Sequence, residues 1–280
     1  MIKGSEIKVL SLSEIERIIE TVKTHHGFDF RNYAPTSFQR RVLRIMEIFK
    51  LPTVDDLIEK IKTSSNFYDV FLSEVTVNTT EMFRDPEMWV ALKDIVSALH
   101  EAKPNQKIKI WHAGCSSGEE VFSMAILLKE LGLYDDVKIT ATDINSTVLE
   151  KAASGIYPVR NMQVNTMNYE KFGGKNMFNS YCTYRENNVE MDSHLLECVE
   201  FVEHNLVQAE QLGTYDIILC RNVMIYFNKI LQDEVFKLFY KSLEKGGYLV
   251  IGAKESLVWC SLSDKFEIVN SKEKIFKKIR

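Results

Sequence analysis

The stretch that decides the fold is IKIWHAGCSSGEE at residues 108–120, followed without a break by VFSMAILLKEL at residues 121–131. An apolar strand runs into a glycine-rich turn, and the turn runs into an amphipathic helix. An α/β domain builds the binding site of a nucleotide-type cofactor from this combination. The segment therefore predicts an α/β domain with a cofactor at the carboxyl end of this strand.

The spacing of the glycines in the turn argues against a dinucleotide. A dinucleotide turn has the pattern G-x-G-x-x-G, in which the second glycine lets a pyrophosphate approach the backbone. Here the glycines are Gly114 and Gly118, and Ser116 stands between them. Glu119 and Glu120 begin the helix and occupy the place where a phosphate would bind a helix N-terminus. We therefore expect a ligand with a ribose and a cationic or zwitterionic part but no phosphates, and S-adenosylmethionine fits that description.

Composition excludes several other classes of protein. The net charge is −4, so no overall basic field indicates nucleic acid or an anionic membrane as a partner. The five cysteines are scattered and never spaced C-x-x-C, which argues against a zinc site or a disulfide framework and favours a reducing compartment. The histidines show no metal-binding spacing, so no metal is expected. With no signal peptide and no apolar run long enough to span a bilayer, the sequence predicts a cytoplasmic protein without membrane insertion.

The pattern along the chain predicts two domains. Residues 1–103 show only helical patterns and predict an all-α N-terminal domain. In residues 104–280 strands alternate with helices, which predicts a mainly parallel sheet with right-handed crossovers. Residues 156–204 interrupt the alternation and predict a small β-rich insertion.

Two strand ends carry polar residues that suit a cofactor site. Asp143 ends the strand VKITATD, where its carboxylate can accept both hydroxyls of a ribose, although it could equally cap the helix that follows. The upstream turn favours the ribose. Arg221, Asn222 and Tyr226 follow the strand YDIILC, which we expect beside the first strand, so that its end opens onto the reactive part of the cofactor. The alternative is a structural arginine that supports the loop and a tyrosine packed as an aromatic.

Two further segments are ambiguous when taken alone. The polar segment NTTEMFR at residues 78–84 precedes a helix, and in isolation it only caps that helix. Arg40, Arg41 and Arg44 cluster away from the apolar stripe of the helix that begins at Pro35. A solvated face is the commoner meaning of such a cluster, and a docking surface for an acidic helix or an anion is the alternative.

These segments together resemble the chemotaxis receptor methyltransferases of the CheR family. The family has an A-G-C-S-x-G-E-E turn, found here at residues 113–120, and a C-R-N-V-x-I-Y-F segment, found at residues 220–227. Its N-x-T-x-F-F-R segment corresponds to residues 78–84, with Met82 in place of the first phenylalanine. The sequences ATDI and SGIY also match, in the family's order. One departure is Lys254, where a small residue such as serine is expected.

The resemblance implies a Rossmann-like class I methyltransferase sheet after the all-α domain, with S-adenosylmethionine as methyl donor and S-adenosylhomocysteine as product. Residues 156–204 would be the family's small β-subdomain, which in some members docks a receptor's C-terminal pentapeptide. No docking motif is matched here. The resemblance also implies which residues bind the cofactor, and we add Ala113 and Gly114 from the strand end and the turn. The full set is Asn78, Thr80, Arg84, Ala113, Gly114, Glu119, Asp143, Asn205, Leu206, Arg221 and Asn222.

The implied reaction forms glutamate methyl esters on the cytoplasmic helical domain of chemoreceptors, as part of adaptation in chemotaxis. Arg84 is the candidate for orienting the incoming carboxylate, and Tyr226 is the candidate for a wall at the methyl group. Receptor methylation helices are rich in glutamate, so Arg40, Arg41 and Arg44 become candidates for substrate binding. We expect a monomer.

Three alternatives stay open at this point. A nucleotide-linked oxidoreductase would share the α/β architecture, but the G-x-G-x-x-G pattern is missing. Another S-adenosylmethionine-dependent methyltransferase is the second alternative. One that acts on nucleic acid would be expected to carry an N-P-P-Y-like segment or a basic groove, and neither is evident. A catalytically silent signalling scaffold of the same fold is the third.

Overall fold

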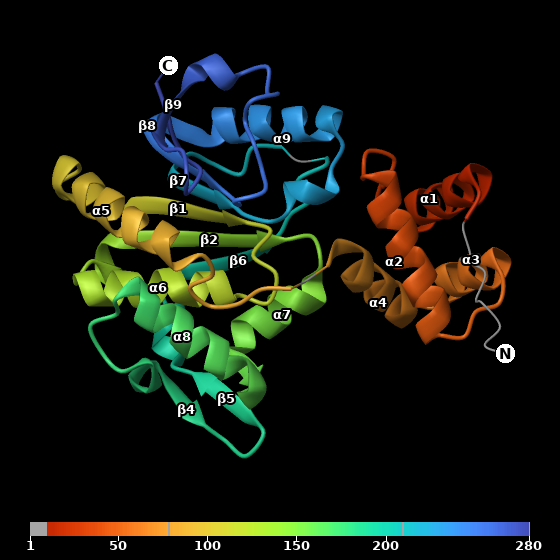
Figure 1. Cartoon of the computed structure of the whole chain (residues 1–280), viewed down its shortest axis with the longest axis horizontal. Coiled ribbons are helices and arrows are strands. Elements are labelled where there is room, and N and C mark those ends of the chain that lie inside the picture. Colours follow the sequence, from red (N-terminus) through yellow and green to blue (C-terminus); the bar gives the residue numbers. More distant parts are fainter. Residues whose placement is uncertain (1–9, 78, 209, 280) are drawn as a thin grey trace, which may run out of the picture. The chain divides into compact units, whose positions relative to one another are not determined.

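The computed structural model describes residues 10–77, 79–208 and 210–279, which form two compact units (Figure 1). Unit 1 consists of residues 10–77 together with residues 226–232. Unit 2 consists of the remaining described residues. Each unit is described by itself.

Unit 1 is helical, as the sequence predicts. Its helices are α1 (Leu12–His26), α2 (Pro35–Ile48), α3 (Val54–Thr63) and α4 (Ser65–Thr76). Helix α1 begins at a complete capping box, in which Ser11 and Glu14 each accept from the other's backbone N–H, and it ends at Gly27 in the left-handed conformation. Helix α2 begins at Pro35, whose missing N–H costs nothing at the first helical position.

An aromatic cluster forms the core of unit 1. Phe30 is almost completely buried and its ring lies 4.2 Å from that of Phe28 and 5.1 Å from that of Phe38. Tyr33 pairs with Phe227 through an isolated β-bridge, and their rings lie 5.1 Å apart. This contact explains why residues 226–232, far away in sequence, belong to unit 1.

Unit 2 is built on a seven-stranded sheet within the described residues, in the order β6-β2-β1-β7-β8-β10-β9. Strands β6, β2, β1, β7 and β8 run parallel to one another, whereas β10 is antiparallel to both β8 and β9. The strands are β1 (Ile108–Ala113), β2 (Val137–Asp143), β6 (Val199–Glu203), β7 (Tyr215–Cys220), β8 (Leu243–Ile251), β9 (Phe266–Asn270) and β10 (Ile275–Lys278). This arrangement confirms the predicted Rossmann-like fold.

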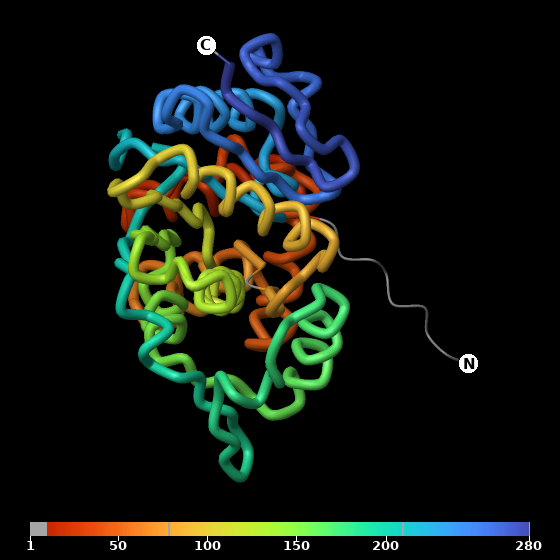
Figure 2. Tube along the Cα trace, turned by 90° about the vertical axis from the view of Figure 1, so that its left-hand side faces the viewer, coloured from red at the N-terminus to blue at the C-terminus, as the bar shows by residue number. Residues whose placement is uncertain are grey.

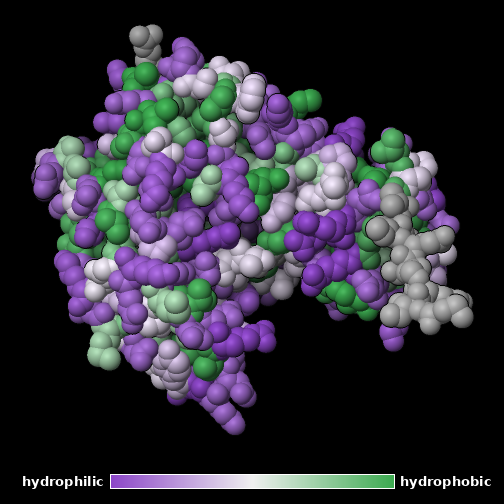
Figure 3. Space-filling view, viewed as in Figure 1, coloured by the Kyte–Doolittle hydropathy of each residue, from purple (hydrophilic) through white to green (hydrophobic). Residues whose placement is uncertain are grey.

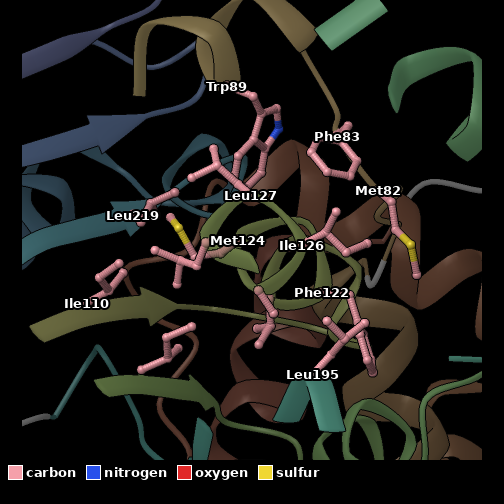
Figure 4. Packing of buried hydrophobic residues seen from close by; sticks show 14 of the residues in the cluster. Met82, Phe83, Trp89, Ile110, Phe122, Met124, Ile126, Leu127, Leu195 and Leu219 are labelled. Carbon is pink, nitrogen blue, oxygen red and sulfur yellow. The ribbon is translucent and has the colours of Figure 1, made fainter. Parts of the chain in front are cut away.

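Helices cover both faces of the sheet. The helices of unit 2 are α5 (Pro86–Ala102), α6 (Glu119–Leu131), α7 (Ser146–Ser154), α8 (Met162–Phe172) and, from Asp233 onward, α9 (Lys229–Ser242). Side chains of α5 and α6, such as Trp89 and Met124, join Ile110 of β1 and Leu219 of β7 in one buried cluster (Figure 4). On the opposite face Trp111 of β1 contacts Phe239 of α9, with ring centroids 5.5 Å apart.

The first domain boundary lies earlier than the sequence analysis places it. The contacts divide the chain after residue 77, whereas the helical pattern predicts a boundary at residue 103. Helix α5 belongs to unit 2 because Trp89 and Leu92 are fully buried in its main core. A helix-only pattern does not reveal which core a helix joins.

The insertion also differs from its predicted extent. It contains β3 (Ile156–Pro158), helix α8, β4 (Cys182–Tyr184) and β5 (Asn188–Met191), and these strands form an antiparallel sheet in the order β3-β5-β4. The β4–β5 hairpin lies at one end of unit 2, at the bottom of Figures 1 and 2. Strand β6, counted within residues 156–204 by the sequence analysis, instead pairs with β2 in the main sheet.

The face of the molecule shown in Figure 3 is largely polar. On the face shown in Figure 3, hydrophilic side chains dominate over both units and apolar ones are scattered among them. None of the helices in residues 10–77, 79–208 and 210–279 combines the length and the apolar character that crossing a membrane requires.

Candidate functional site

The candidate site lies where the parallel strands of unit 2 end. Strand β1 has β2 on one side and β7 on the other, so the chain reverses its direction of winding at β1. Ligands of such sheets bind outside the carboxyl ends of the strands at this switch point. Ala113, Asp143 and Cys220 end these three strands, and they bring the turn, the acid and the Arg221–Asn222 pair to one edge.

The turn after β1 packs directly against the loop after β7. The N–H groups of Gly114 and Cys115 both donate to the carbonyl of Thr142, at 2.8 Å, which fixes the turn to β2. Gly114 has φ +80°, and a Cβ there would lie 2.5 Å from Cγ2 of Val223. Only glycine permits both the conformation and the close approach. We call the turn at residues 113–119, Asp143 and the loop at residues 221–223 the cofactor cradle.

Asp143 is a buried acceptor in this cradle and does not cap the next helix. Its Oδ2 accepts from the N–H of Ser116 at 2.9 Å, and its Oδ1 accepts from the N–H of Asn145 at 3.1 Å. The N-cap of α7 is Asn145, whose side chain accepts from the N–H of Thr147. A carboxylate has about four acceptor positions, so it can take further donors such as ribose hydroxyls. Burial raises the pKa of Asp143, and added donors would favour its ionised form.

Glu119 supplies a second buried carboxylate at the other end of the turn. It follows Gly118, the N-cap of α6, and its side chain accepts from the hydroxyl of Ser117 at 2.7 Å. Burial raises the pKa of Glu119. A nearby cation would reverse that effect by stabilising the ionised form. The Oγ of Ser116 is buried without a hydrogen-bond partner among the described residues, which adds an unsatisfied polar atom to the same turn.

Arg221 is buried, and its guanidinium joins three segments. Its Nη1 donates to Glu120 of α6 at 3.0 Å. Its Nη2 donates to the carbonyl of Arg84 at 3.1 Å and also to the carboxylate of Asp85. These are the contacts of an arginine that supports a loop, which is the alternative that the sequence left open. Arg221 therefore positions the segment at residues 79–85 against the cradle.

Glu120 completes this buried charged network. Its Oε1 is hydrogen-bonded to Nδ1 of His112, 2.9 Å away on the neighbouring strand β1. Burial acts to raise the pKa of Glu120, but the hydrogen bond from His112 and the charge of Arg221 outweigh it and hold that pKa below its usual range. An ionised Glu120 is thus the counter-charge that permits Arg221 to be buried.

The segment at residues 79–85 is held by side chains from two helices. The N–H of Met82 donates to Asn165 of α8 at 3.0 Å, and Asn168 donates back to the carbonyl of Met82 at 3.1 Å. The N–H of Phe83 donates to the hydroxyl of Ser123 in α6 at 2.8 Å. This segment carries the predicted residues Thr80 and Arg84. Asn78, predicted beside them, lies outside the described residues.

A buried carboxylate that the sequence analysis does not select, Glu255, anchors the loop after β7. It accepts from the N–H of Gly252, from that of Asn222 at 3.2 Å and from that of Met224 at 2.7 Å. Asn222 has φ +62°, so this anchor holds a conformation that few residues other than glycine adopt. The signal in the sequence was a G-x-x-E directly after a strand.

The other predicted site residues fall in different places. One residue separates Asn205 and Leu206 from the end of β6, the neighbour of β2, and they therefore lie at the same edge of the sheet as Asp143. Tyr226 belongs to unit 1, where its carbonyl accepts from the N–H of Ala34. The three arginines of α2 also belong to unit 1; one of them, Arg44, forms an ion pair with Glu74 of α4 at 3.4 Å.

The cysteine in the cradle is not suited to nucleophilic catalysis. Cys115 is almost completely buried, and burial raises the pKa of its thiol well above the usual value, so the reactive thiolate is disfavoured. Within the described residues no group of three or more histidine, cysteine or acidic side chains is arranged to hold a metal ion.

A Rossmann-like sheet with a glycine turn and two buried acids at its switch point is typical of the S-adenosylmethionine-dependent methyltransferases. Comparison with known families gives the more specific assignment. The family described as CheR methyltransferase, SAM binding domain, matches residues 78–275, and its all-alpha domain matches residues 13–76. The chain therefore belongs to the CheR methyltransferase family, as the resemblance implies.

Similar proteins span nearly the whole chain. The Cher3 protein of Pseudomonas putida is 41% identical over 265 residues, which is 95% of this chain and 96% of that protein. The chemotaxis protein methyltransferase 1 of Vibrio cholerae is 34% identical over 86% of this chain and 87% of its own length. A solved structure of magnesium protoporphyrin IX methyltransferase from Synechocystis matches 98% of this chain and 100% of its own chain, at 12% sequence identity and a TM-score of 0.40.

The close contact between the turn and the loop predicts the effect of a single methyl group. Gly114→Ala should lower the free energy of unfolding by about 1–3 kcal/mol, because it adds both a strained φ and a clash with a stiff β-branched side chain. It should also weaken binding of S-adenosylhomocysteine in a calorimetric titration. Val223→Ala in the same chain removes the clash but not the strain, so the double variant should recover part of both losses. Equal losses in the single and double variants would contradict the proposed contact.

Proposed function

We propose that this chain transfers a methyl group from S-adenosylmethionine to glutamate side chains on the cytoplasmic helical domain of chemoreceptors, giving methyl esters. The observation that carries the proposal is the cofactor cradle, in which an open turn lies between the buried carboxylates of Asp143 and Glu119. The names of the relatives, chemotaxis protein methyltransferases, support this substrate. A cytoplasmic location follows from the proposed substrate.

The cradle fits S-adenosylmethionine by the chemistry of its groups. The remaining acceptor positions of Asp143 suit the ribose hydroxyls. Glu119 suits the ammonium group of the methionine part, which would stabilise its ionised form. Asn205 and Leu206 follow the strand beside Asp143, and we assign them to the far side of the same nucleoside. When bound, this molecule supplies an activated methyl group on a sulfonium.

The proposed reaction needs no general base. A glutamate carboxylate is already ionised at pH 7 and is therefore already a nucleophile. The protein's task is to align one carboxylate oxygen with the methyl carbon, and such positioning can supply about 7–11 kcal/mol of a barrier. We propose that Arg84, on the segment held by Arg221, orients the incoming carboxylate.

The contact to the substrate carboxylate should be weak. Its negative charge disappears as the ester forms, so a strong bidentate arginine would stabilise the substrate more than the transition state. Both terminal nitrogens of Arg221 already donate to Glu120, to Asp85 and to the carbonyl of Arg84. Arg221 is therefore assigned a positioning role, and the half-buried Arg84 side chain stays the candidate for a single contact.

The reaction can be tested by methyl transfer from tritiated S-adenosylmethionine to the purified signalling domains of receptors from the same organism. The expected result is label on the receptor that base releases as methanol, which is diagnostic of an ester. Asp143→Ala should abolish most of this transfer, whereas Asp135→Ala, at an exposed aspartate of the same unit, should not. Base-stable label would indicate another acceptor, and no label at all would favour the silent scaffold.

A second prediction concerns the basic face of α2, to which we assign receptor docking. Arg40 and Arg44 are exposed, and Arg41 between them is half-buried. Charge reversal of all three residues to glutamate should raise KM for the receptor about tenfold or more, mainly through slower association, and less so at high salt. Arg17→Glu, at an exposed arginine of α1, is the control. If methylation were unchanged at both low and high salt, this docking surface would be rejected.

A further inference from the structure

The loop at residues 252–262, directly after β8, presents large apolar side chains to solvent. Val258 is 74% exposed and Trp259 is 73% exposed. The chain has two other tryptophans, Trp89 and Trp111, and both are completely buried. Val258 and Trp259 are adjacent and together form a contiguous apolar patch, and such patches mark contact surfaces. The loop therefore needs an explanation that the cofactor site does not give.

This loop is fixed at both ends by buried or charged acceptors. At its start Glu255 binds the N–H groups of Gly252, Asn222 and Met224. At its end the N–H and the hydroxyl of Ser261 donate to Asp233 of α9 at 2.6 and 3.0 Å. Val258 and Trp259 thus stand on an ordered backbone. A preorganised surface binds a partner at a lower cost in conformational entropy.

Burial alternates within the loop and separates its anchors from its exposed side chains. Leu257 and Cys260 are buried together with Glu255, whereas Val258 and Trp259 are exposed. Lys254, the residue at which this chain departs from the expected small side chain, is exposed as well. The loop therefore combines an apolar pair with a positive charge on its solvent side.

The loop lies at the edge of the sheet that the substrate must approach. Strand β8 runs parallel to β7, so the loop begins at the same edge as the cofactor cradle. Glu255 ties it directly to Asn222, a residue of the cradle. A glutamate side chain is short, so the helix that carries it has to lie across this edge to deliver its carboxylate. A loop fixed to the cradle and exposed at this edge is placed to contact that helix.

We propose that Lys254, Val258 and Trp259 form a docking element for the acidic, amphipathic helix that carries the methylated glutamate. In this account, which rests on the proposed function, Val258 and Trp259 pack on apolar side chains of the helix and Lys254 faces its carboxylates. Tryptophan is enriched among the residues that dominate binding energy at interfaces. A charged residue at the rim of an interface raises the association rate and fixes the register of the partner.

The test compares receptor methylation by the wild type, the Val258→Ala/Trp259→Ala double variant and Lys254→Glu. The double variant should raise KM for the receptor domain at least tenfold and leave kcat and the affinity for S-adenosylhomocysteine unchanged. Lys254→Glu should raise KM less, and the effect should shrink with salt. The matched control is Ile268→Ala, at a residue of β9 that is 62% exposed. An unchanged KM in the double variant would overturn the proposal.

A binding measurement keeps this inference separate from the reaction. Adding the receptor domain should shift the tryptophan fluorescence of the wild type to shorter wavelength, and the shift should be absent in Trp259→Ala, which retains only the buried tryptophans. If the wild type bound in this way but transferred no methyl group, the proposed function would fail and the docking element would stand. If Trp259→Ala instead changed the oligomeric state and not receptor binding, the exposed pair would be a contact between copies of this chain.

Discussion

The buried guanidinium of Arg221 is the interaction on which the candidate site depends. Arg221 lies directly after β7. Its guanidinium donates to the carboxylate of Glu120 at the start of α6, to the carbonyl of Arg84 and to the carboxylate of Asp85. Removing one member of a buried ion pair typically costs about 3–5 kcal/mol, because the other is left uncompensated. One side chain therefore fixes the relative positions of the turn, the loop after β7 and the segment that leads into α5.

Two acidic residues that follow each other in sequence, Glu119 and Glu120, have different tasks because they face different surroundings. Glu120 is held ionised by His112 and Arg221, and it serves the fold. The carboxylate of Glu119 accepts from the hydroxyl of Ser117 and has no arginine or histidine among its hydrogen-bond partners in the described residues, and burial raises its pKa. A site that keeps one carboxylate satisfied and leaves its neighbour to accept a cation suits a zwitterionic ligand. The side chain of Val223, packed against Gly114, leaves no room for a larger residue in the turn.

Much of the fold could be predicted from local sequence. Caps and glycines mark the ends of helices, and the turn after β1 identifies the cofactor edge, because these signals depend on a few neighbouring residues. The membership of α5 in unit 2 could not be predicted, since it rests on the packing of Trp89 and Leu92 into a distant core. The pairing of β6 with β2 is likewise invisible in a short apolar stretch.

The roles of the site residues were less predictable than their location. The sequence predicts Arg221 at the cofactor, and the structure places it at the end of β7, at the switch point of the sheet. Its partners Glu120 and Asp85 lie far away in sequence and make it a support for the loop. The role of Glu255 could not be predicted because its partners are backbone N–H groups, two of which lie on another segment. The central claim, a site for S-adenosylmethionine that excludes phosphates, is tested most directly by calorimetric titration of the wild type and Asp143→Asn. The wild type should bind one S-adenosylhomocysteine per chain and no NADH, and Asp143→Asn should bind S-adenosylhomocysteine at least tenfold more weakly. Binding of NADH, or full S-adenosylhomocysteine affinity in Asp143→Asn, would contradict the account.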